Sequence, residues 1–134
     1  MKWLYRNLYR KEKGFTLVEL MIVIIILAIL TGIAVPSYMV LRNRARIQAT
    51  RAEMLNIATA ISLYDADQDT FPVATTITGL ETALENGGYM KNCPTTDGWN
   101  IAYTYTGEPT TYTLGSTGGG VAAITLTDGV FVGE

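Results

Sequence analysis

The fold of this chain is decided by the stretch Gly14-Phe15-Thr16-Leu17-Val18-Glu19-Leu20-Met21. It opens an apolar run of 21 residues, Phe15 to Val35, in which Glu19 is the only charged residue. As an α-helix this run is about 32 Å long, which is enough to cross the hydrocarbon core of a bilayer. The sequence therefore predicts one membrane-spanning helix near the N-terminus, with an acid close to its start.

Charge is distributed unevenly around this run. Residues 1–14 carry five basic side chains against one acid, whereas from Glu53 onward only Lys91 opposes ten acids. A basic segment before an apolar helix favours a cytoplasmic N-terminus. The acidic downstream portion argues against nucleic-acid binding by the main domain.

An ordinary secretory signal peptide fits this N-terminus poorly. Such a signal places a small-residue cleavage site after a shorter apolar region. Here the only leader-like boundary, Lys13-Gly14-Phe15, comes before the apolar run. Cleavage at this boundary leaves the membrane helix attached to the mature chain.

The acid in the apolar run needs an explanation of its own, because a charged carboxylate in hydrocarbon is costly. An isolated membrane helix offers Glu19 no partner. Cleavage after Gly14 creates a new amine on Phe15, and the amine of a neighbouring copy can neutralise Glu19. The alternative is that Glu19 lies at the membrane interface and needs no partner.

The run from Gly14 to Val23 resembles the prepilin-type processing and methylation motif of type IV pilins and pseudopilins. The resemblance implies cleavage after Gly14 by a membrane prepilin peptidase and N-methylation of Phe15. It also implies that Glu19 pairs with the N-terminus of an adjacent subunit. The implied fold is α+β, with one long N-terminal helix whose second half packs on an antiparallel sheet of three to four strands.

Five segments are expected on this basis. They are a basic leader that is removed (1–14), a transmembrane and assembly helix (15–36), the amphipathic half of that helix (37–69), a loop with a short helix (70–98) and an antiparallel β-meander (99–134). Pro36 removes a helical hydrogen bond, so it predicts either a simple kink or a section that unwinds when copies pack into a fibre.

Beyond Pro36 the pattern becomes amphipathic. Apolar residues recur at helical spacing and are predicted to bury against the sheet: Met54, Ile57, Ala58, Ile61 and Tyr64. Four arginines, Arg42, Arg44, Arg46 and Arg51, precede or interrupt this stripe. They have two open interpretations, which are contact with anionic lipid headgroups and pairing with acids of a neighbouring copy.

Short elements follow. Thr78 to Tyr89 predicts a helix capped by Thr78 and ended by Gly87-Gly88. Alternating residues predict three strands, Trp99 to Thr106, Thr110 to Gly115 and Val121 to Thr127, and Val130 to Val132 is a candidate for a fourth.

Nothing in this sequence indicates an enzyme, a cofactor or a metal site. The chain has no histidine and a single cysteine, Cys93, which is interpreted as a partly buried loop residue. Asp65, Asp67 and Asp69 alternate like the start of a calcium loop, but Thr70 and Thr76 occupy the positions that need glycine and glutamate. They are interpreted as a solvated helix end.

Two functions remain. The residue order from Tyr64 to Asn100 is similar to the major pseudopilin of type II secretion systems, although the acid-rich loop that binds calcium in that family is missing after Gly115. The ending Ile124 to Gly129 looks more like a major pilin.

We therefore expect a structural subunit that polymerises from a single-pass inner-membrane precursor into a homo-oligomeric helical filament. Prepilin peptidase and an inner-membrane assembly platform are its expected partners. The filament is predicted to be an extracellular type IV pilus for adhesion, motility or DNA uptake. The alternative is a major-type pseudopilin of a type II secretion system, which forms a periplasmic pseudopilus.

Overall fold

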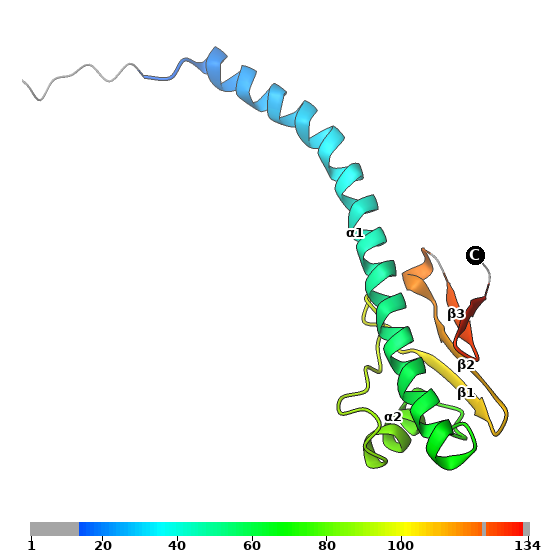
Figure 1. Ribbon diagram of the computed structural model, residues 1–134. Coiled ribbons are helices and arrows are strands. Elements are labelled where there is room, and N and C mark those ends of the chain that lie inside the picture. Colours follow the sequence, from blue (N-terminus) through cyan, green and yellow to red (C-terminus); the bar gives the residue numbers. More distant parts are fainter. Residues whose placement is uncertain (1–13, 122, 133–134) are drawn as a thin grey trace, which may run out of the picture. The chain divides into compact units, whose positions relative to one another are not determined.

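The computed structural model describes residues 14–121 and 123–132 (Figure 1). The predicted leader, apart from Gly14, and Ala122 of the predicted third strand lie outside the described residues. Two compact units divide the chain between Met39 and Val40. The elements follow the order of an α+β fold, with a long helix, a short helix and then strands.

The long helix, α1, spans Leu17–Gln68 and has 52 residues. It contains Pro36 and is not interrupted there. One residue further on, the Ser37 hydroxyl donates a hydrogen bond of 3.1 Å to the carbonyl of Ile33. The single chain thus stays helical through Pro36, and unwinding within a fibre stays a prediction.

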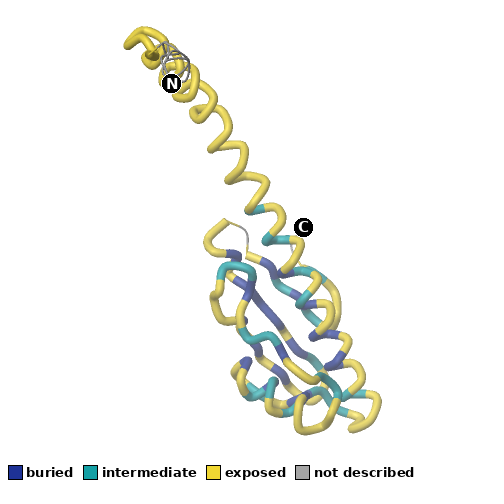
Figure 2. The backbone as a smooth tube through the Cα atoms, turned by 90° about the vertical axis from the view of Figure 1, so that its left-hand side faces the viewer, coloured by how far each residue is buried: buried dark blue, intermediate teal, exposed yellow. Residues whose placement is uncertain are grey.

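The first part of α1 is apolar on all sides and exposed. Its most apolar window of 18 residues has a mean hydropathy of 2.9, and none of it is buried. Figure 2 shows this stretch as continuously exposed. Among the described residues, α1 is the one helix that is long and apolar enough to span a membrane.

The later part of α1 buries one face. Thr50, Met54, Ile57, Ala58, Ala60 and Ile61 are buried, and Ile47 and Tyr64 pack beside them as partly buried residues. Most of the predicted apolar stripe is confirmed. Leu55, which lies off this face, is exposed.

The sheet has four antiparallel strands in the order β1-β2-β3-β4, each paired with the next along the chain. The strands are β1 Thr104–Glu108, β2 Thr111–Ser116, β3 Ile124–Thr127 and β4 Val130–Val132. Their inward side chains, Tyr105, Tyr112, Leu114 and Leu126, are fully buried. They form one core with the apolar face of α1 (Figure 2), so the predicted antiparallel meander is confirmed, including the fourth strand.

The first predicted strand begins too early, at Trp99. The Asp97 carboxylate accepts hydrogen bonds from the backbone N–H groups of Trp99 and Ile101, at 2.9 and 3.0 Å, and folds residues 97–101 into a turn. Asn100 takes a left-handed φ of 63° within it. The extended strand therefore starts only at Thr104.

The third strand also starts later than predicted, at Ile124. Before it, Gly118–Gly120 forms a 3-10 turn, and Val121 N–H donates to the carbonyl of Gly118. Gly119 has a φ of 60°, and a Cβ at this position would lie 2.5 Å from the Trp99 ring. Gly119 thus allows the chain to pack closely on Trp99.

The short helix α2 spans Ile77–Asn86, and Thr76 rather than Thr78 is its N-cap. The Thr76 hydroxyl accepts a hydrogen bond of 3.2 Å from Gly79 N–H. The helix starts before Thr78 because the buried set Ile77, Leu80 and Leu84, at helical spacing, begins there. It ends at Gly87, as predicted.

A buried carboxylate ties the end of β2 to the turn before β1. Besides its two backbone bonds, Asp97 accepts a hydrogen bond of 2.6 Å from the Ser116 hydroxyl, which in turn accepts one of 3.0 Å from Gly118 N–H. Burial raises the pKa of Asp97, but the hydrogen bonds from Ser116, Ile101 and Trp99 lower it further, so the net pKa is below the ordinary value. The network therefore favours the charged form of the Asp97 carboxylate.

This network predicts a loss of stability in acid. Because the folded pKa of Asp97 is lowered, its contribution is present above the unfolded pKa of about 3.9 and is lost as the pH falls through the folded value. We expect Asp97→Asn to lower the free energy of unfolding at pH 7 by about 1–2 kcal/mol and to weaken the acid dependence. Urea unfolding of the full chain in detergent at pH 7 and pH 3 measures both.

Asp69→Asn is the matched control, because Asp69 is exposed and makes no side-chain hydrogen bond within the described part of the chain. It should unfold like the wild type at pH 7. An acid dependence that is the same in Asp97→Asn and the wild type would contradict the assignment.

Candidate processing and assembly site

The helix α1 begins with a reciprocal pair of hydrogen bonds between Thr16 and Glu19. The Thr16 N–H and hydroxyl donate to Oε2 of Glu19 at 2.9 and 3.0 Å, and Glu19 N–H donates to the Thr16 hydroxyl oxygen at 3.2 Å. This is a capping box, in which a threonine and a glutamate three residues later satisfy each other's backbone donors. It fixes where α1 starts and how the Glu19 carboxylate lies.

This geometry corrects one expectation. The isolated helix was expected to offer Glu19 no partner, but Thr16 supplies two donors. The pattern Thr-x-x-Glu in the sequence is itself a local signal for such a cap. Both donors go to Oε2, and no residue in the described ranges donates to Oε1. One carboxylate oxygen is left for an outside partner.

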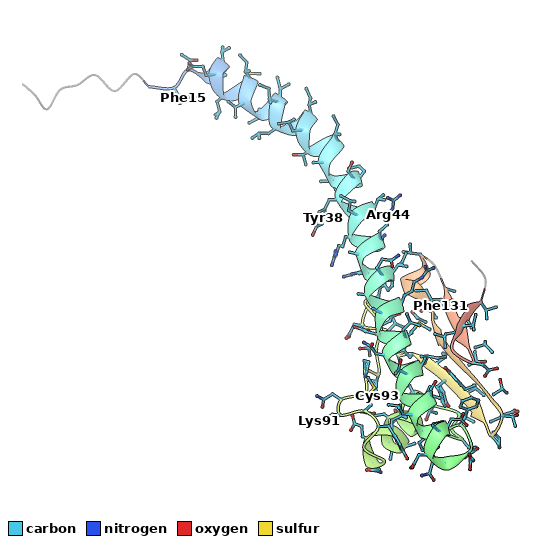
Figure 3. All side chains as sticks on the ribbon, viewed as in Figure 1. Phe15, Tyr38, Arg44, Lys91, Cys93 and Phe131 are labelled. Atoms are coloured by element: carbon cyan, nitrogen blue, oxygen red, sulfur yellow. The ribbon has the colours of Figure 1, made fainter. Side chains whose placement is uncertain are left out.

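The predicted cleavage junction lies immediately before this cap. Phe15 is 80% exposed, and Figure 3 draws it at the start of α1. A Cβ added to Gly14 would meet no atom within 4 Å, and the backbone of Gly14 is not left-handed. Neither packing nor conformation within the chain requires a glycine here, which is consistent with a requirement set by another protein.

Cleavage between Gly14 and Phe15 would preserve the capping box. Its donors are the N–H and hydroxyl of Thr16 and the N–H of Glu19, and none belongs to Phe15. The new amine on Phe15 would lie one residue from Thr16. The cap therefore fits both the precursor and the mature chain.

The structure brings together Phe15, Thr16 and Glu19, but not Pro36. Glu19 and Pro36 are 17 residues apart on α1, which is about 26 Å along the helix. Any role of Pro36 in assembly is therefore separate from the charge at the helix start.

The three alternating aspartates do not converge on one point. Asp67 accepts hydrogen bonds from the Tyr89 hydroxyl and from Nε2 of Gln68, and these bonds lower its pKa. Asp69 lies after the helix end with a φ of 54°. The cluster terminates α1, and its bond to Tyr89 fixes the loop that follows α2.

Cys93 is buried, and its environment disfavours the thiolate. Burial, followed by the nearby carboxylates of Glu81 and Glu85, raises the pKa of Cys93 to about 11. The thiolate is the nucleophilic form of cysteine. The environment of Cys93 therefore suits a cysteine that packs in the core and not a reactive thiol.

The loop after β2 does not fit the calcium site of the pseudopilin family that the chain resembles, in agreement with the missing acid-rich loop in the sequence. A calcium ion takes six to eight oxygen ligands, usually including several carboxylates. Among the described residues, the only carboxylate bonded to the end of β2, where this loop starts, is Asp97, and its two oxygens already accept three hydrogen bonds. Within the described ranges, no group of three or more potential metal-ligating acids, cysteines or histidines occurs.

The fold and the N-terminal sequence together are those of proteins that carry a prepilin-type N-terminal motif. The family model described as a prokaryotic N-terminal methylation motif matches residues 9–35. A second model, described as type II secretion system (T2SS), protein G, matches residues 37–123. The chain belongs to the type II secretion system protein G family.

Curated relatives agree with this membership. A protein of Pseudomonas aeruginosa is 31% identical over 126 residues, covering 81% of this chain and 87% of the relative. Relatives from Vibrio cholerae and Escherichia coli are each 32% identical, covering 81% of this chain and 84% and 82% of their own lengths. All three are named type II secretion system core protein G. No solved structure matches the chain significantly.

These matches overturn the main functional prediction. The expectation of an extracellular type IV pilus subunit is wrong, and the alternative, a pseudopilin of a type II secretion system, agrees with the relatives. The prediction gave weight to the ending Ile124 to Gly129, which lies beyond the matched residues 37–123. The matched range covers the end of α1, α2 and the first two strands, and these elements carry the family signal.

The capping box predicts a measurable effect of Thr16. Thr16→Val removes the hydroxyl, so the start of α1 should fray, because an N-cap side chain stabilises the first turn. We expect the amide hydrogens of Val18 to Leu20 to exchange roughly fivefold faster in detergent micelles. Hydrogen exchange followed by mass spectrometry measures this rate.

Thr16→Ser keeps a hydroxyl at the same position and is the matched control. It should protect these amides as well as the wild type does. Equal exchange in all three proteins would show that the cap does not stabilise the helix start.

Proposed function

We propose that this chain is a structural, non-enzymatic subunit of the pseudopilus of a type II secretion system. One observation carries the proposal, namely the match of residues 37–123 to the protein G family. Residues 40–123 of this range fall in the second compact unit, which is built from the later part of α1, α2 and the sheet. In this role the subunits form a short periplasmic fibre that helps to move folded proteins through an outer-membrane pore.

The first part of α1 anchors the precursor in the inner membrane before assembly. Its apolar surface has the length and the exposure that a membrane helix requires. The basic residues before it favour a cytoplasmic N-terminus, so the second compact unit faces the periplasm. The membrane, prepilin peptidase and an inner-membrane assembly platform are the partners that this route requires.

Processing converts the anchor into an assembly element. Prepilin peptidase cleaves between Gly14 and Phe15, removes residues 1–14, and methylates the new amine on Phe15. The amine of one copy pairs with the Glu19 carboxylate of a neighbour. The Thr16 cap supports this pairing because it orients the carboxylate and leaves Oε1 for the incoming cation.

Pro36 has a separate role in this proposal. A proline lacks the N–H that would bond to the carbonyl four residues earlier, so the helix is weakest around this point. We propose that this section of α1 unwinds when subunits pack into the fibre, which lets neighbouring helices approach closely.

Gly14→Ala tests processing. The variant should accumulate as uncleaved precursor in the inner membrane, and secretion through the system should fall to the level of a strain that lacks this chain. Mass spectrometry of the N-terminus and assay of a secreted enzyme measure the two effects. A normal start at N-methyl-Phe15 in this variant would contradict the assigned junction.

Glu19→Ala and Glu19→Gln separate the charge from the cap. Glutamine preserves the capping box, because either Glu or Gln serves in it, but carries no charge. If the ion pair drives assembly, both variants should be cleaved and both should be missing from sheared, pelleted fibres. Wild-type fibre levels in Glu19→Gln would show that the cap, and not the charge, is what assembly needs.

A further inference from the structure

Two arginines at the start of the second compact unit, Arg42 and Arg44, have no partner among the residues that the structure describes. Arg46 lies over the Trp99 ring at 5.9 Å, and Arg51 lies over the Phe131 ring at 5.6 Å. Arg42 and Arg44 are exposed and make no hydrogen bond, ion pair or ring contact with any residue that the structure describes. Figure 3 shows Arg44 on α1 with its side chain free of the sheet.

The acids of the same unit separate into bonded and unbonded groups. Glu53, Glu85, Asp97 and Asp128 accept hydrogen bonds within the chain. The side chains of Asp65, Asp69, Glu81 and Glu108 accept none from the described residues. Of these, Asp65, Asp69 and Glu108 belong to one end of the unit, because Phe71 N–H and the Thr70 hydroxyl donate to the Pro109 carbonyl at 3.2 and 3.3 Å. Those bonds hold the β1–β2 turn beside the end of α1 (Figure 1).

This acidic end is electrostatically unfavourable within a single copy. The C-terminus of a helix carries partial negative charge and is stabilised by cations. The last turn of α1 contains no basic residue and is followed by further acid. The last turn of α1 thus has no basic side chain to offset the partial negative charge of the helix end.

The two surfaces cannot pair within one chain. Arg44 and Asp65 are 21 residues apart on α1, or about 32 Å along the helix, which is several times the Debye length of about 8 Å at physiological salt. A second copy displaced along the helix axis by about this distance would bring them together.

We propose that the second compact units of neighbouring copies stack end to end. Arg42 and Arg44 of one copy then lie against Asp65, Asp69 and Glu108 of another. This inference rests on the proposed function. The contact joins two different surfaces of identical chains, and such a heterologous interface extends into an open helical fibre when its rotation does not close a ring. The arginines supply the cation that the end of α1 lacks. Charge complementarity thus identifies a second copy of this chain as the partner.

Charge reversal with rescue tests the pairing in cells that produce the whole secretion system. Arg44→Glu and Asp65→Arg should each lower the amount of this chain in sheared, pelleted fibres by about fivefold or more. The double variant should return to within about twofold of the wild type. Both single changes introduce residues that suit a helix, and Asp65→Arg also complements the dipole of α1. Defective folding would therefore not explain a lower amount of these variants in fibres.

Lys91→Glu is the matched control. Lys91 is an exposed cation of the same unit without a bonded partner among the described residues, and the change in net charge is the same as in Arg44→Glu. Its fibre level should match the wild type. A fibre loss in Lys91→Glu as large as in Arg44→Glu would overturn the inference, because net charge alone would then be responsible.

Cross-linking supplies a second measurement. In a Cys93→Ser background, Arg44→Cys combined with Asp65→Cys should give a ladder of covalently linked multimers after treatment of fibres with a bifunctional thiol cross-linker that spans the length of an Arg–Asp ion pair. Each single cysteine should give no ladder. A double-cysteine chain that is present in fibres and stays monomeric would overturn the pairing.

Other outcomes separate the hypotheses. Loss of fibres in Arg44→Glu together with normal fibres in Asp65→Arg would overturn the inference in favour of contact between the arginines and anionic lipid headgroups. If the wild-type chain assembles and supports secretion but the double variant reaches no higher fibre level than the single variants, only the pairing is contradicted. A wild-type chain that is absent from fibres contradicts both the pairing and the proposed function.

Discussion

The first part of α1 exposes an apolar surface that no described residue of the same chain covers. Exposing such a surface to water is unfavourable in proportion to its area, so either lipid or other copies of the helix must cover it. Both environments appear in the proposed route, first the bilayer and then the fibre. The rest of the chain is compatible with both, because the second unit has its own core and does not depend on how this surface is covered.

The Glu19 carboxylate lies at the start of that apolar helix. In the proposed route, it has a charged partner in the fibre that it lacks in the bilayer. Glu19 is held by Thr16 through a cap that involves no atom of Phe15, so the carboxylate has the same local bonds before and after cleavage at Gly14. What cleavage changes is the charge beside it. In the proposed route, a carboxylate that is oriented but not neutralised would pair with the amine that exists only on processed copies, and this would couple processing to assembly.

The second unit divides its charges by position. Acids near the core are satisfied by hydrogen bonds, as in the Asp97 network that joins β2 to the preceding turn. Charges without such bonds among the described residues include Arg42 and Arg44 at one end and Asp65, Asp69 and Glu108 at the other. The network from Asp97 through Ser116 to Gly118 N–H supports the start of the loop after β2. In the proposed stack, the two sets of unbonded charges would face each other across neighbouring copies.

Sequence by itself determined the elements that depend on local pattern. The apolar run of Phe15 to Val35, the helical spacing of Met54 to Ile61 and the alternation along β1 to β3 predicted the long helix and the meander, because hydrophobic periodicity relates residues only a few positions apart along the chain. The same motif also identified Gly14, Phe15 and Glu19 as candidates for processing and assembly. Thr16 was within reach of the same reasoning, since its capping pattern is local.

Only the tertiary structure decided which polar groups meet across the fold. Asp97 bends residues 97–101 and shortens β1 because Ser116, nineteen residues away, and two backbone N–H groups converge on it. Gly119, after β2, packs closely on Trp99. The division of the charges into bonded and unbonded sets depends on these contacts. No periodicity encodes such long-range contacts, because they form only when the core of α1 and the sheet has closed.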